Sequence, residues 1–568
     1  MDRDQVVLHI YEQLLEYEQR LIPTGLHILG RAPAPEMLAD ILCMVASFDR
    51  PDCGARSLPN LVAEGLGLPN YETLLAGSAL SEQHLSDRER VESLVRGAVT
   101  LFLQSSSAAA AEYLARQAGA CREASMRTLA VLDGIRGNLA ANREIDSLLR
   151  GLRGEYIEPG PGADIVQNPA VLPTGRNIHA VNPYGVPSAV AFAKAERTVQ
   201  ALLNRCLREQ GKYPEAIGMV LWGMDNIKTQ GEGVAQALRL MGVAPHRDAI
   251  NRITDVEVIP LRALGRPRID VVMTVSGIFR DLFGPTVELL DKAARSVAAL
   301  DEPEEQNYLH KHARDQQSEG SSFEDAATRV FSNAPGNYGT NVNFMVMDGQ
   351  WQRPEELGDL FVARKCFAYG RQAGGRVARQ LLEQALGRVE ATYQNIDNAE
   401  IGITDVDHYF EYLGGLTQAV AGRSGKKPPV YLTDALAPLE KIRSLEETVR
   451  LEARTKTLNP KWYDGMLRHG FSGVAQIEQH VSNTFGWSAT AGAVEDWVYD
   501  EIAATYLLDE SLLERLRSAN ADATRSLTLR LLEARERGFW NASGGTVERL
   551  LDILTGLEDQ MEGIGAAG

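Results

Sequence analysis

The chain has little cysteine, no long apolar run and no excess of basic residues, and each shortage excludes a class of protein. Only five of its 568 residues are cysteine, and no two have CxxC spacing, so neither a disulfide framework nor a structural zinc cluster is expected. Such sparse cysteine fits a cytoplasmic location best. No apolar stretch reaches about 18 residues and the first residues are acidic and amphipathic, so we expect neither a transmembrane helix nor a signal peptide. Because the net charge is −18, nucleic acid is not expected as the main partner.

Several catalytic signatures are also absent from the sequence. GRSGKKP near residue 425 has neither the spacing nor the Ser or Thr of a GxxxxGK[ST] loop, so this chain is not expected to hydrolyse ATP through a P-loop. The glycines at 231 and 233 follow a predicted strand, but Gln236 occupies the place of the third glycine of a dinucleotide site. No HExxH or GxSxG motif occurs. His310 and His312 are two residues apart on a predicted helix, so they point to different sides and make a poor metal pair.

Hydrophobic periodicity predicts an α/β plus α protein, in which a parallel-sheet α/β central region is flanked by helical amino- and carboxyl-terminal regions. We expect a helical region at 1–150, an α/β domain with a Pro/Gly-rich entry loop at 151–345, a mixed α/β region at 346–440 and a helical region at 441–568. The predicted strands are AIGMVLW, VEVIPL, RIDVVMTVSG and PPVYLTDA. They alternate with helices such as VAQALRLMG, which implies right-handed βαβ units with binding loops at the carboxyl ends of the strands.

The strongest local candidate for a chemical site is the string TDVDHYFE at 404–411. Thr404 can cap a helix there, and Asp405, His408 and Glu411 then recur every three residues on one face. Two carboxylates and an imidazole could hold a hard cation or move protons. The alternative is a solvated helix start, where acidic residues suit the helix dipole, and spacing alone favours this alternative.

Two further strings follow predicted strands. Asp225 and Lys228 lie in WGMDNIK, at a strand end where α/β proteins place ligand groups, although an ordinary capped turn explains the pattern equally well. Arg268 precedes a strand and Arg280 follows it, so Arg280 could face a carboxylate ligand in bidentate fashion or simply pair with its neighbour Asp281.

Two charged strings favour structural interpretations. The acidic string at 302–307 is typical of a solvated helix start. The string at 446–463 is typical of a helix stabilised by opposite charges, although it runs into an unusual Asn-Pro-Lys-Trp-Tyr sequence.

Longer strings are more specific than these patterns. They include RLIPTGLHILG, GEYIEPGPGADIVQNPAVLPTGRNIHA, YPEAIGMVLWGMDNIKTQGEG, LGRPRIDVVMTVSGIFRDLF, ATRVFSNAPGNYGTNVN, TDVDHYFEYLGG, RLEARTKTLNPKWYDGMLRHG and GWSATAGAVEDWVY. In sequence and order they resemble the family of magnesium chelatase H subunits and the related CobN subunits of cobaltochelatase. GWSATAGAV and the ending LEDQMEGI look like the magnesium branch. Family members are roughly twice as long, and the chain is similar to their carboxyl-terminal half. Thr24 stands where many relatives carry Cys, and Glu411 stands where some magnesium enzymes carry Asp.

The resemblance implies a catalytic, porphyrin-binding subunit, or its carboxyl-terminal half, of an ATP-dependent magnesium chelatase, which inserts Mg²⁺ into protoporphyrin IX in chlorophyll or bacteriochlorophyll biosynthesis. It implies that ATP is hydrolysed by an AAA+ motor subunit, working with a second subunit that carries AAA+-like and integrin-I-type domains. It assigns active-site roles to His408 and Glu411: we expect Glu411, with Asp405, to deliver the metal while His408 takes protons. The residues expected to bind the porphyrin are Arg176, Asp225, Lys228, Arg268 and Arg280.

Two alternatives remain open at this point. One is a CobN-like subunit that inserts Co²⁺ into a corrinoid. The other is a non-catalytic tetrapyrrole-binding or scaffold protein, which the short length favours because the expected cavity would be incomplete.

Overall fold

The computed structural model describes residues 3–76, 81–166, 168–179, 181–371, 373–398, 400–434 and 441–563. The chain forms two compact units, which we describe separately. The first unit comprises the described residues up to His179 together with Arg454–Gly465. The second comprises the described residues of Ala180–Ala435, Glu440–Ala453 and Met466–Gly568.

The first unit is built mainly of helices, which occupy the region that the sequence pattern predicted to be helical. Serines at positions 57, 81 and 106 accept hydrogen bonds from the first turns of α3, α5 and α6, so the helix starts are encoded locally. A short parallel pair, β1 (Pro159–Pro161) with β2 (Asn177–His179), follows in the Pro/Gly-rich segment. The helices are α1 (Arg3–Gln19), α2 (Pro35–Ala46), α3 (Leu58–Gly65), α4 (Tyr71–Ala76), α5 (Glu82–Gln104), α6 (Ser107–Ala118), α7 (Arg122–Ala140) and α8 (Glu144–Leu152).

The second unit contains an eight-stranded sheet with the order β12-β11-β10-β3-β6-β7-β8-β9. The inner strands β11, β10, β3, β6 and β7 are parallel, whereas β12, β8 and β9 join antiparallel at the two edges. The prediction of a parallel sheet is therefore right for the middle of the sheet and wrong for its edges. The strands are β3 (Ala216–Leu221), β6 (Asp270–Val275), β7 (Val330–Ser332), β8 (Phe367–Gly370), β9 (Ala373–Val377), β10 (Ala391–Ile396), β11 (Val430–Asp434) and β12 (Lys441–Ser444).

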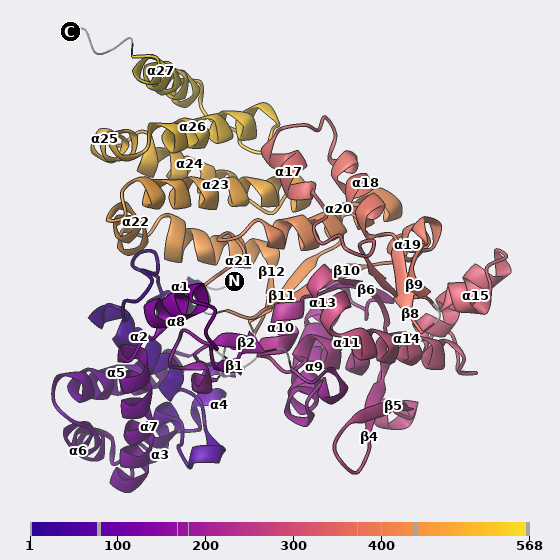
Figure 1. Cartoon of the computed structure of the whole chain (residues 1–568), viewed down its shortest axis with the longest axis horizontal. Helices are drawn as coiled ribbons and strands as arrows, with labels where there is room; N and C mark the ends of the chain where they lie inside the picture. The colour runs from indigo at the N-terminus through magenta and orange to yellow at the C-terminus, as the bar shows by residue number, and fades with distance from the viewer. Residues whose placement is uncertain are drawn as a thin grey trace. The chain divides into compact units, whose positions relative to one another are not determined.

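Helices cover both faces of this sheet (Figure 1), which explains why its central strands read as continuous apolar runs. Every residue of β3 and β6 is buried. On one face lie α9 (Ala189–Gln210), α11 (Glu232–Met241) and α14 (Gly284–Ala298), and on the other α18 (Pro354–Lys365), α19 (Arg379–Leu386) and α20 (Gly415–Ser424). The predicted strand VEVIPL forms β5 (Ile253–Val258), but it pairs with β4 (Val243–Arg247) in a separate antiparallel hairpin, not in the sheet.

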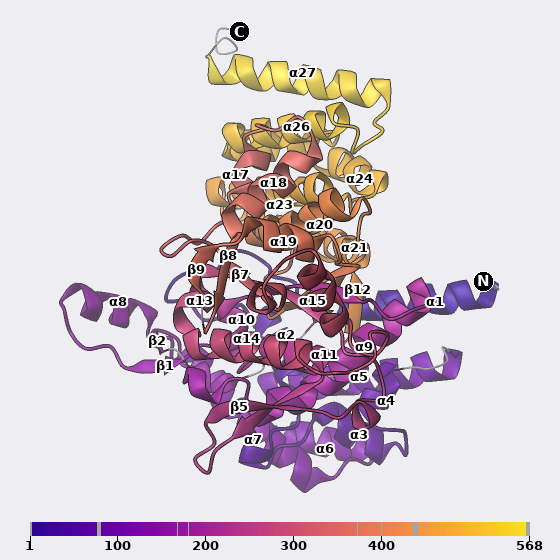
Figure 2. The same cartoon turned by 90° about the vertical axis from the view of Figure 1, so that its right-hand side faces the viewer.

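The carboxyl-terminal part of the second unit is helical, and α23, α26 and α27 pack in succession (Figure 2). These helices are α21 (Leu445–Glu452), α23 (Phe471–Ala491), α24 (Asp496–Tyr506), α25 (Glu510–Ala519), α26 (Ala521–Glu536) and α27 (Gly544–Met561). The remaining helices are α10 (Gly223–Lys228), α12 (Leu261–Leu264), α13 (Gly277–Leu282), α15 (Tyr308–Ser318), α16 (Phe323–Ala326), α17 (Val342–Met347) and α22 (Pro460–Leu467). Within the part of the chain that the structure describes, no helix combines the length and apolarity needed to cross a bilayer.

A buried ion network lies at the amino-terminal end of β6. Asp270 pairs with Arg329 through two hydrogen bonds of 2.6 and 3.0 Å, and both side chains are almost completely buried. His312 contacts Asp270 through Nδ1 (2.9 Å), while His310 contacts the Ala298 carbonyl, so the two histidines do face different partners as predicted. Burial works to raise the pKa of Asp270, but the charge of Arg329 and the contact with His312 lower it to about 2.

The chain leaves the centre of the sheet in two directions. From β3 it continues outward to β6 and β7, and from the neighbouring β10 it continues the other way to β11 and β12. In open α/β sheets, ligands bind beyond the carboxyl ends of the strands at such a switch point. The segments that follow β3 and β10 are therefore the first place to look for a site.

Candidate active site at the carboxyl edge of the sheet

Glu411 and His408 lie on the segment that leads from β10 into α20. The helix begins at His408 and passes through a π-helical turn, Phe410–Gly414, before α20. The Gly414–Gly415 pair lets this turn approach its neighbours closely, because a Cβ on Gly414 would lie 2.2 Å from Thr490 Oγ1 and one on Gly415 would lie 2.8 Å from the Phe361 ring. Glu411 is therefore buried, whereas the His408 imidazole, one turn earlier, lies at the surface.

The Glu411 carboxylate is fixed by donors on both of its oxygens. Oε1 accepts hydrogen bonds from the backbone N–H groups of Thr340 and Asn341 (2.9 Å for the latter) and from the Thr340 hydroxyl (3.0 Å). Oε2 lies 3.0 Å from His408 Nδ1. The Glu411 side chain is 2% exposed and the His408 side chain 64%, so the pair joins a buried carboxylate to a solvent-facing imidazole.

These contacts keep Glu411 ionised. Burial alone would raise the pKa of Glu411, but the hydrogen bond and charge of His408, with the donors of Thr340, bring that pKa below its ordinary value. Conversely, the hydrogen bond to Glu411 raises the pKa of His408 against the effect of burial. A second carboxylate is near, because Asp407 Oδ1 lies 3.5 Å from His408 Nδ1. The cluster therefore offers oxygen ligands beside a group that can exchange protons.

The loop that supplies the donors to Glu411, residues 333–341, is held from several sides. Arg280 donates to the carbonyls of Asn333 (3.2 Å), Ala334 (2.8 Å) and Asn337 (3.0 Å). Asn341 has a left-handed backbone (φ 63°), and a Cβ on Gly339 would lie only 3.0 Å from Glu411 Oε1. The loop geometry is thus shaped around the carboxylate.

Lys365, at the end of α18, ties this loop to the sheet. Its Nζ donates to the Val275 carbonyl at the end of β6 (3.0 Å) and to Asn333 Oδ1 (2.8 Å), and it lies 3.9 Å from the centroid of the Tyr412 ring. Asn333 in turn donates to the Gly339 carbonyl (2.8 Å). Burial lowers the pKa of Lys365 well below its ordinary value, while the charge of Glu411 opposes that shift. Two oxygen acceptors and the face of the Tyr412 ring therefore surround the amine.

We expect Lys365→Met to loosen the loop at 333–341. The substitution leaves Asn333 Oδ1 without a donor and removes one of two donors to the Val275 carbonyl, which keeps the Ser332 hydroxyl, so the free energy of unfolding of the second unit should fall by about 2 kcal/mol. Urea unfolding measures this loss, and hydrogen exchange at the Thr340 and Asn341 amides should accelerate. The matched control is Lys292→Met, which removes an exposed lysine paired with Asp255 and should change stability by less than about 0.5 kcal/mol. Unchanged exchange at both amides would contradict this role for Lys365.

Asp405 does not share a face with His408 and Glu411, so that part of the sequence prediction is wrong. The segment before His408 is a turn and not a helix, and Asp405 Oδ2 accepts a hydrogen bond from the Gly402 N–H (2.6 Å). Glu452 draws the same turn inward by accepting the N–H groups of Ile403 (2.8 Å) and Thr404 (2.9 Å). This nonlocal contact overrides the three-residue spacing.

Asp405 instead belongs to a buried cluster with Glu452 and His480, whose ligand atoms lie within 4.8 Å of one another. Such a set is capable of holding a cation. Both oxygens of Glu452 nevertheless already accept backbone N–H groups, and a Cβ on Gly402 would lie 2.0 Å from Glu452 Oε1. We therefore assign Glu452 to holding the turn.

Asp225 and Lys228 lie at the switch point, after β3, as the sequence pattern predicts. Lys228 Nζ is 2.9 Å from Asp397 Oδ2, which follows β10. Asp225 is buried, its Oδ1 has no hydrogen-bond partner among the described residues, and burial together with the charge of Asp397 raises its pKa well above the ordinary value. The Trp222 ring contacts the Tyr412 ring, with centroids 4.4 Å apart, so the segment that follows β3 adjoins the surroundings of Glu411.

Two predicted porphyrin ligands are structural arginines. Arg268 is completely buried, and all of its guanidinium nitrogens donate to protein acceptors, including both oxygens of Glu302 (2.7 and 3.0 Å). Arg280 is paired in bidentate fashion with Asp281 (2.6 and 2.9 Å), as its alternative interpretation proposed, and it also holds the loop described above. Neither guanidinium has a face left for a propionate in this structure.

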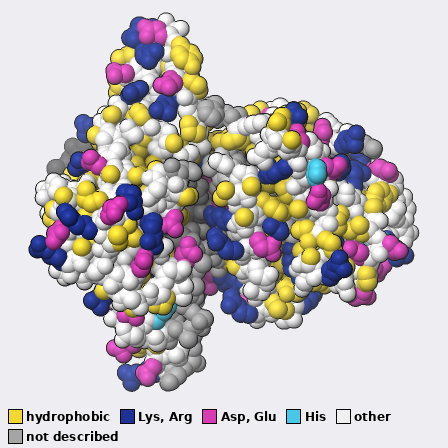
Figure 3. All heavy atoms as spheres, turned by 90° about the horizontal axis from the view of Figure 1, so that it is seen from below, with side chains coloured by type: hydrophobic (Ala, Val, Ile, Leu, Met, Phe, Trp, Pro, Cys, Tyr) yellow, Lys and Arg dark blue, Asp and Glu magenta, His cyan; other side chains and the backbone are white. Residues whose placement is uncertain are grey.

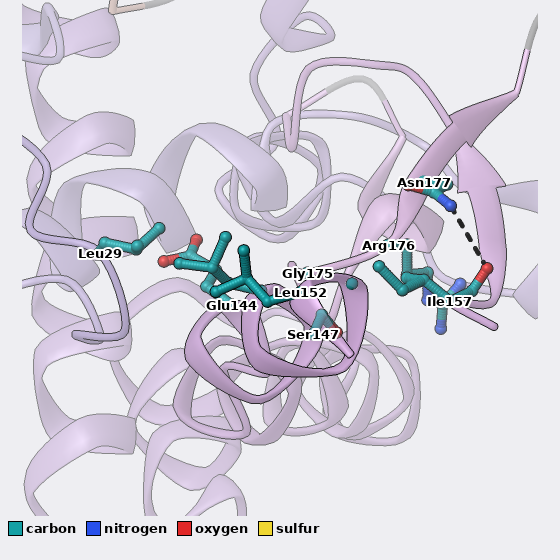
Figure 4. Close-up of a pocket in the computed structure, with 10 residues that line it drawn as sticks. Leu29, Glu144, Ser147, Leu152, Ile157, Gly175, Arg176 and Asn177 are labelled. Atoms are coloured by element: carbon teal, nitrogen blue, oxygen red, sulfur yellow. Dashed lines mark hydrogen bonds between the residues drawn. The ribbon is translucent and has the colours of Figure 1, made fainter. Parts of the chain in front are cut away.

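Arg176 belongs to the first unit, unlike the other candidates. It lines a groove of about 390 Å³ beside α8, drawn in Figure 4. Its Nε is buried and has no hydrogen-bond partner in the described residues.

Sequence reasoning missed three groups that surround the candidate site. Lys365 stands at a helix end, where a lysine is ordinary, and His480 lies within an uninterrupted helical pattern, so neither carries a local signal. Glu452 lies in a charged string that was interpreted as helix-stabilising. Only the fold reveals that these residues meet the segment at 402–411.

Comparison with known proteins extends these observations. Residues 1–547 match a family model described as CobN/Magnesium Chelatase. The chain is 42% identical to the protein named magnesium-chelatase subunit ChlH, chloroplastic, from Oryza sativa subsp. indica, in an alignment covering 99% of this chain and 43% of that protein. It is 36% identical to the magnesium-chelatase H subunit of Chlorobaculum parvum, over 98% of this chain and 45% of that protein. The solved structure titled catalytic subunit of cobaltochelatase from Mycobacterium tuberculosis matches with a TM-score of 0.89 and 32% identity, covering 98% of this chain and 47% of that one.

The chain spans a little under half the length of each of these relatives. The family model nevertheless matches nearly all of its residues, and the fold matches across the same extent. The chain therefore belongs to the CobN/magnesium chelatase family.

Proposed function

We propose that this chain carries the metal-inserting site of a magnesium chelatase and inserts Mg²⁺ into a porphyrin, protoporphyrin IX. The observation that carries the proposal is the Glu411–His408 pair, in which a buried carboxylate is held by the loop at 333–341 and contacts an exposed imidazole. Relatives that align with almost the whole chain are named as magnesium-chelatase H subunits. The reaction class is that of a ligase forming nitrogen–metal bonds.

The chemistry of insertion requires both kinds of group in this pair. Mg²⁺ prefers oxygen ligands and gives up its waters reluctantly, so a carboxylate fixed in place lowers the cost of replacing water. The macrocycle must also lose two N–H protons as the metal enters. We assign metal delivery to Glu411, and proton acceptance and relay to the exposed ring of His408. Asp407, not Asp405, is the second carboxylate within reach of the ring.

Porphyrin binding needs an apolar surface and a cation for the propionates. Trp222, which is half-buried, is an aromatic ring at the surface next to the candidate site, and it packs on the buried ring of Tyr412. Lys228, with a 16% exposed side chain, lies six residues after Trp222 and is the cation we propose for a propionate, and Asp397 would have to release it. Arg176 in the first unit is the other basic candidate.

We further propose that the energy for insertion comes from other subunits in the cytoplasm. The sequence has no phosphate-binding loop, and several relatives are named as subunits of larger enzymes. An AAA+ motor subunit and a subunit with AAA+-like and integrin-I-type domains would then hydrolyse ATP and act on this chain through an interface.

Cobalt insertion into a corrinoid is the second candidate function. It is favoured by the match to a cobaltochelatase catalytic subunit at a TM-score of 0.89. The higher identity to a magnesium-chelatase subunit, 42% against 32%, supports magnesium as the first choice. A non-catalytic tetrapyrrole-binding role is the third.

Reconstitution separates the three functions. The chain is combined with the motor subunits, ATP, Mg²⁺ and protoporphyrin IX, and metalloporphyrin fluorescence reports insertion; a parallel reaction uses Co²⁺ and hydrogenobyrinic acid diamide. Because the chain spans less than half of its relatives, each reaction is repeated with the unmatched part of the Chlorobaculum parvum protein added as a second polypeptide. Porphyrin binding without insertion in every mixture would support the non-catalytic role.

A further inference from the structure

Helix α8 in the first unit is amphipathic but buries none of its side chains. Its apolar residues Ile145, Leu148, Leu149 and Leu152 are 44%, 50%, 47% and 77% exposed. A helix of nine residues is not stable by itself in water, and most helices are stabilised by packing their apolar side. The short helix α8 therefore lacks most of the apolar packing that usually stabilises a helix.

This helix is nevertheless held in place at its amino-terminal end. Glu144 Oε2 accepts the N–H of Gly30 (2.7 Å) and lies 3.0 Å from His27 Nε2. Gly175 has a left-handed backbone (φ 90°) and packs so closely that a Cβ would lie 2.6 Å from the backbone carbon of Arg143. The exposed apolar side of α8 is therefore a preformed surface.

A groove runs along this surface. Its apolar walls include Leu29, Leu148, Leu152 and Ile157, and Glu144 and Arg176 add one charge of each sign. Figure 4 shows Leu152 and Ser147 on α8, with Leu29 on one side and Arg176 and Ile157 on the other. The unpartnered Nε of Arg176 leaves a donor for an acceptor that the described residues do not provide.

The apolar surface is larger than the groove. Ile145 and Leu149 are exposed but do not line it, and Tyr156 and Ile178, which follow α8, are 72% and 63% exposed. Exposed hydrophobic side chains also occur elsewhere among charged ones, as one face of the molecule shows (Figure 3), but a helix exposed along its whole apolar side marks an interaction site. An occupant that covers all of it must extend beyond a single small ligand.

We propose that α8 and the adjoining groove dock the polypeptide that makes up the remainder of the family's length. More than half of each relative's length lies outside its match to this chain, so a large partner surface is available in the family. That polypeptide would bury the leucines of α8 and offer a carboxylate or carbonyl oxygen to Arg176. This inference is independent of which metal is inserted.

The test uses the full chain and the unmatched part of the Chlorobaculum parvum protein as a separate polypeptide. Calorimetry should detect one-to-one binding, and the double variant Leu148→Asp with Leu152→Asp should weaken it by at least about tenfold. Leu551→Asp is the matched control: this leucine is 48% exposed on α27 in the other unit, and its substitution should leave the affinity unchanged. If the fragment does not fold alone, it is joined to this chain, and hydrogen exchange across α8 should be slowed relative to the chain alone.

Several results would overturn the proposal. These are absence of binding in both arrangements, equal affinity of the wild type and the α8 variant, or an α8 variant that alters only self-association or only protoporphyrin IX binding. Sedimentation of the chain alone and porphyrin fluorescence quenching detect the last two. Since no turnover is measured, failure here is distinguishable from failure of the proposed metal insertion.

Discussion

Replacement of Glu411 by Gln is expected to slow Mg²⁺ insertion about 100-fold or more while leaving porphyrin affinity unchanged. The amide keeps the shape of the side chain and still accepts from Thr340 and Asn341 through its oxygen. It loses the negative charge that attracts the cation, and its nitrogen cannot accept a hydrogen bond from His408 Nδ1. The measurement is metalloporphyrin fluorescence in the reconstituted system, with fluorescence quenching for porphyrin binding.

The matched control for this experiment is Glu447→Gln. Glu447 is also a carboxylate that binds a backbone N–H, that of Ser444, and a cationic side chain, Arg205. It lies at the start of α21 and has no contact with the Glu411 pair, so insertion should continue at the wild-type rate. Insertion by the Glu411 variant at the wild-type rate, or a collapse of porphyrin binding with it, would remove Glu411 from the proposed role.

The sequence was sufficient to predict what depends on local pattern. The strands β3, β6 and β11 were predicted because residues buried on both faces form continuous apolar runs. The association of His408 with Glu411 followed from their spacing of three residues, and the structure brings their polar atoms to 3.0 Å. The antiparallel edge strands could not be predicted, since strand direction depends on chain connections and not on composition.

The sequence could not show which charged residues are already paired with other groups inside the folded protein. Arg280 follows β6, at the end of the strand where ligand groups ordinarily lie, and Arg268 precedes β6, yet Asp281 pairs with the first and Glu302 with the second. Asp405 was separated from His408 by the contacts of Glu452, which lies 47 positions after Asp405 in the chain. The outcomes for Arg268 and Asp405 rest on nonlocal contacts that only the packed structure specifies, whereas the pairing of Arg280 with Asp281 is local and was the open alternative.

The candidate site also depends on nonlocal contacts of strand β6, which supports the loop around Glu411. Strand β6 carries Asp270 at its start and ends at Val275, whose carbonyl accepts from Lys365 and so supports the loop around Glu411. The pair of Asp270 with Arg329 anchors β6 where β7 begins. Loss of this anchor should therefore have a large effect on stability.

Arg329→Met is expected to lower the free energy of unfolding of the second unit by roughly 3–5 kcal/mol, because it leaves the Asp270 carboxylate buried without its main counter-charge. Urea unfolding followed by tryptophan fluorescence measures the change, since every tryptophan except Trp462 belongs to that unit. The matched control is Arg314→Met, which removes an exposed arginine near Glu304 and should cost less than about 0.5 kcal/mol. A loss below about 1 kcal/mol for Arg329→Met would contradict the assigned role of the pair.

A pH series and a double variant separate the charge from the packing. The pKa of Asp270 is depressed to about 2 in the folded state, so its stabilising effect is complete above its unfolded pKa of about 4 and is lost as the pH falls towards 2. In the wild type the free energy of unfolding should fall across that interval. In Arg329→Met, burial without the main counter-charge should raise the pKa of Asp270, so the fall due to this group should disappear or reverse, with acidification relieving part of the loss. Adding Asp270→Leu to Arg329→Met removes the unpaired charge and should restore part of the lost stability. If the double variant is as unstable as the sum of the two single ones, the pair acts through packing alone, and the ion pair is not the anchor of β6.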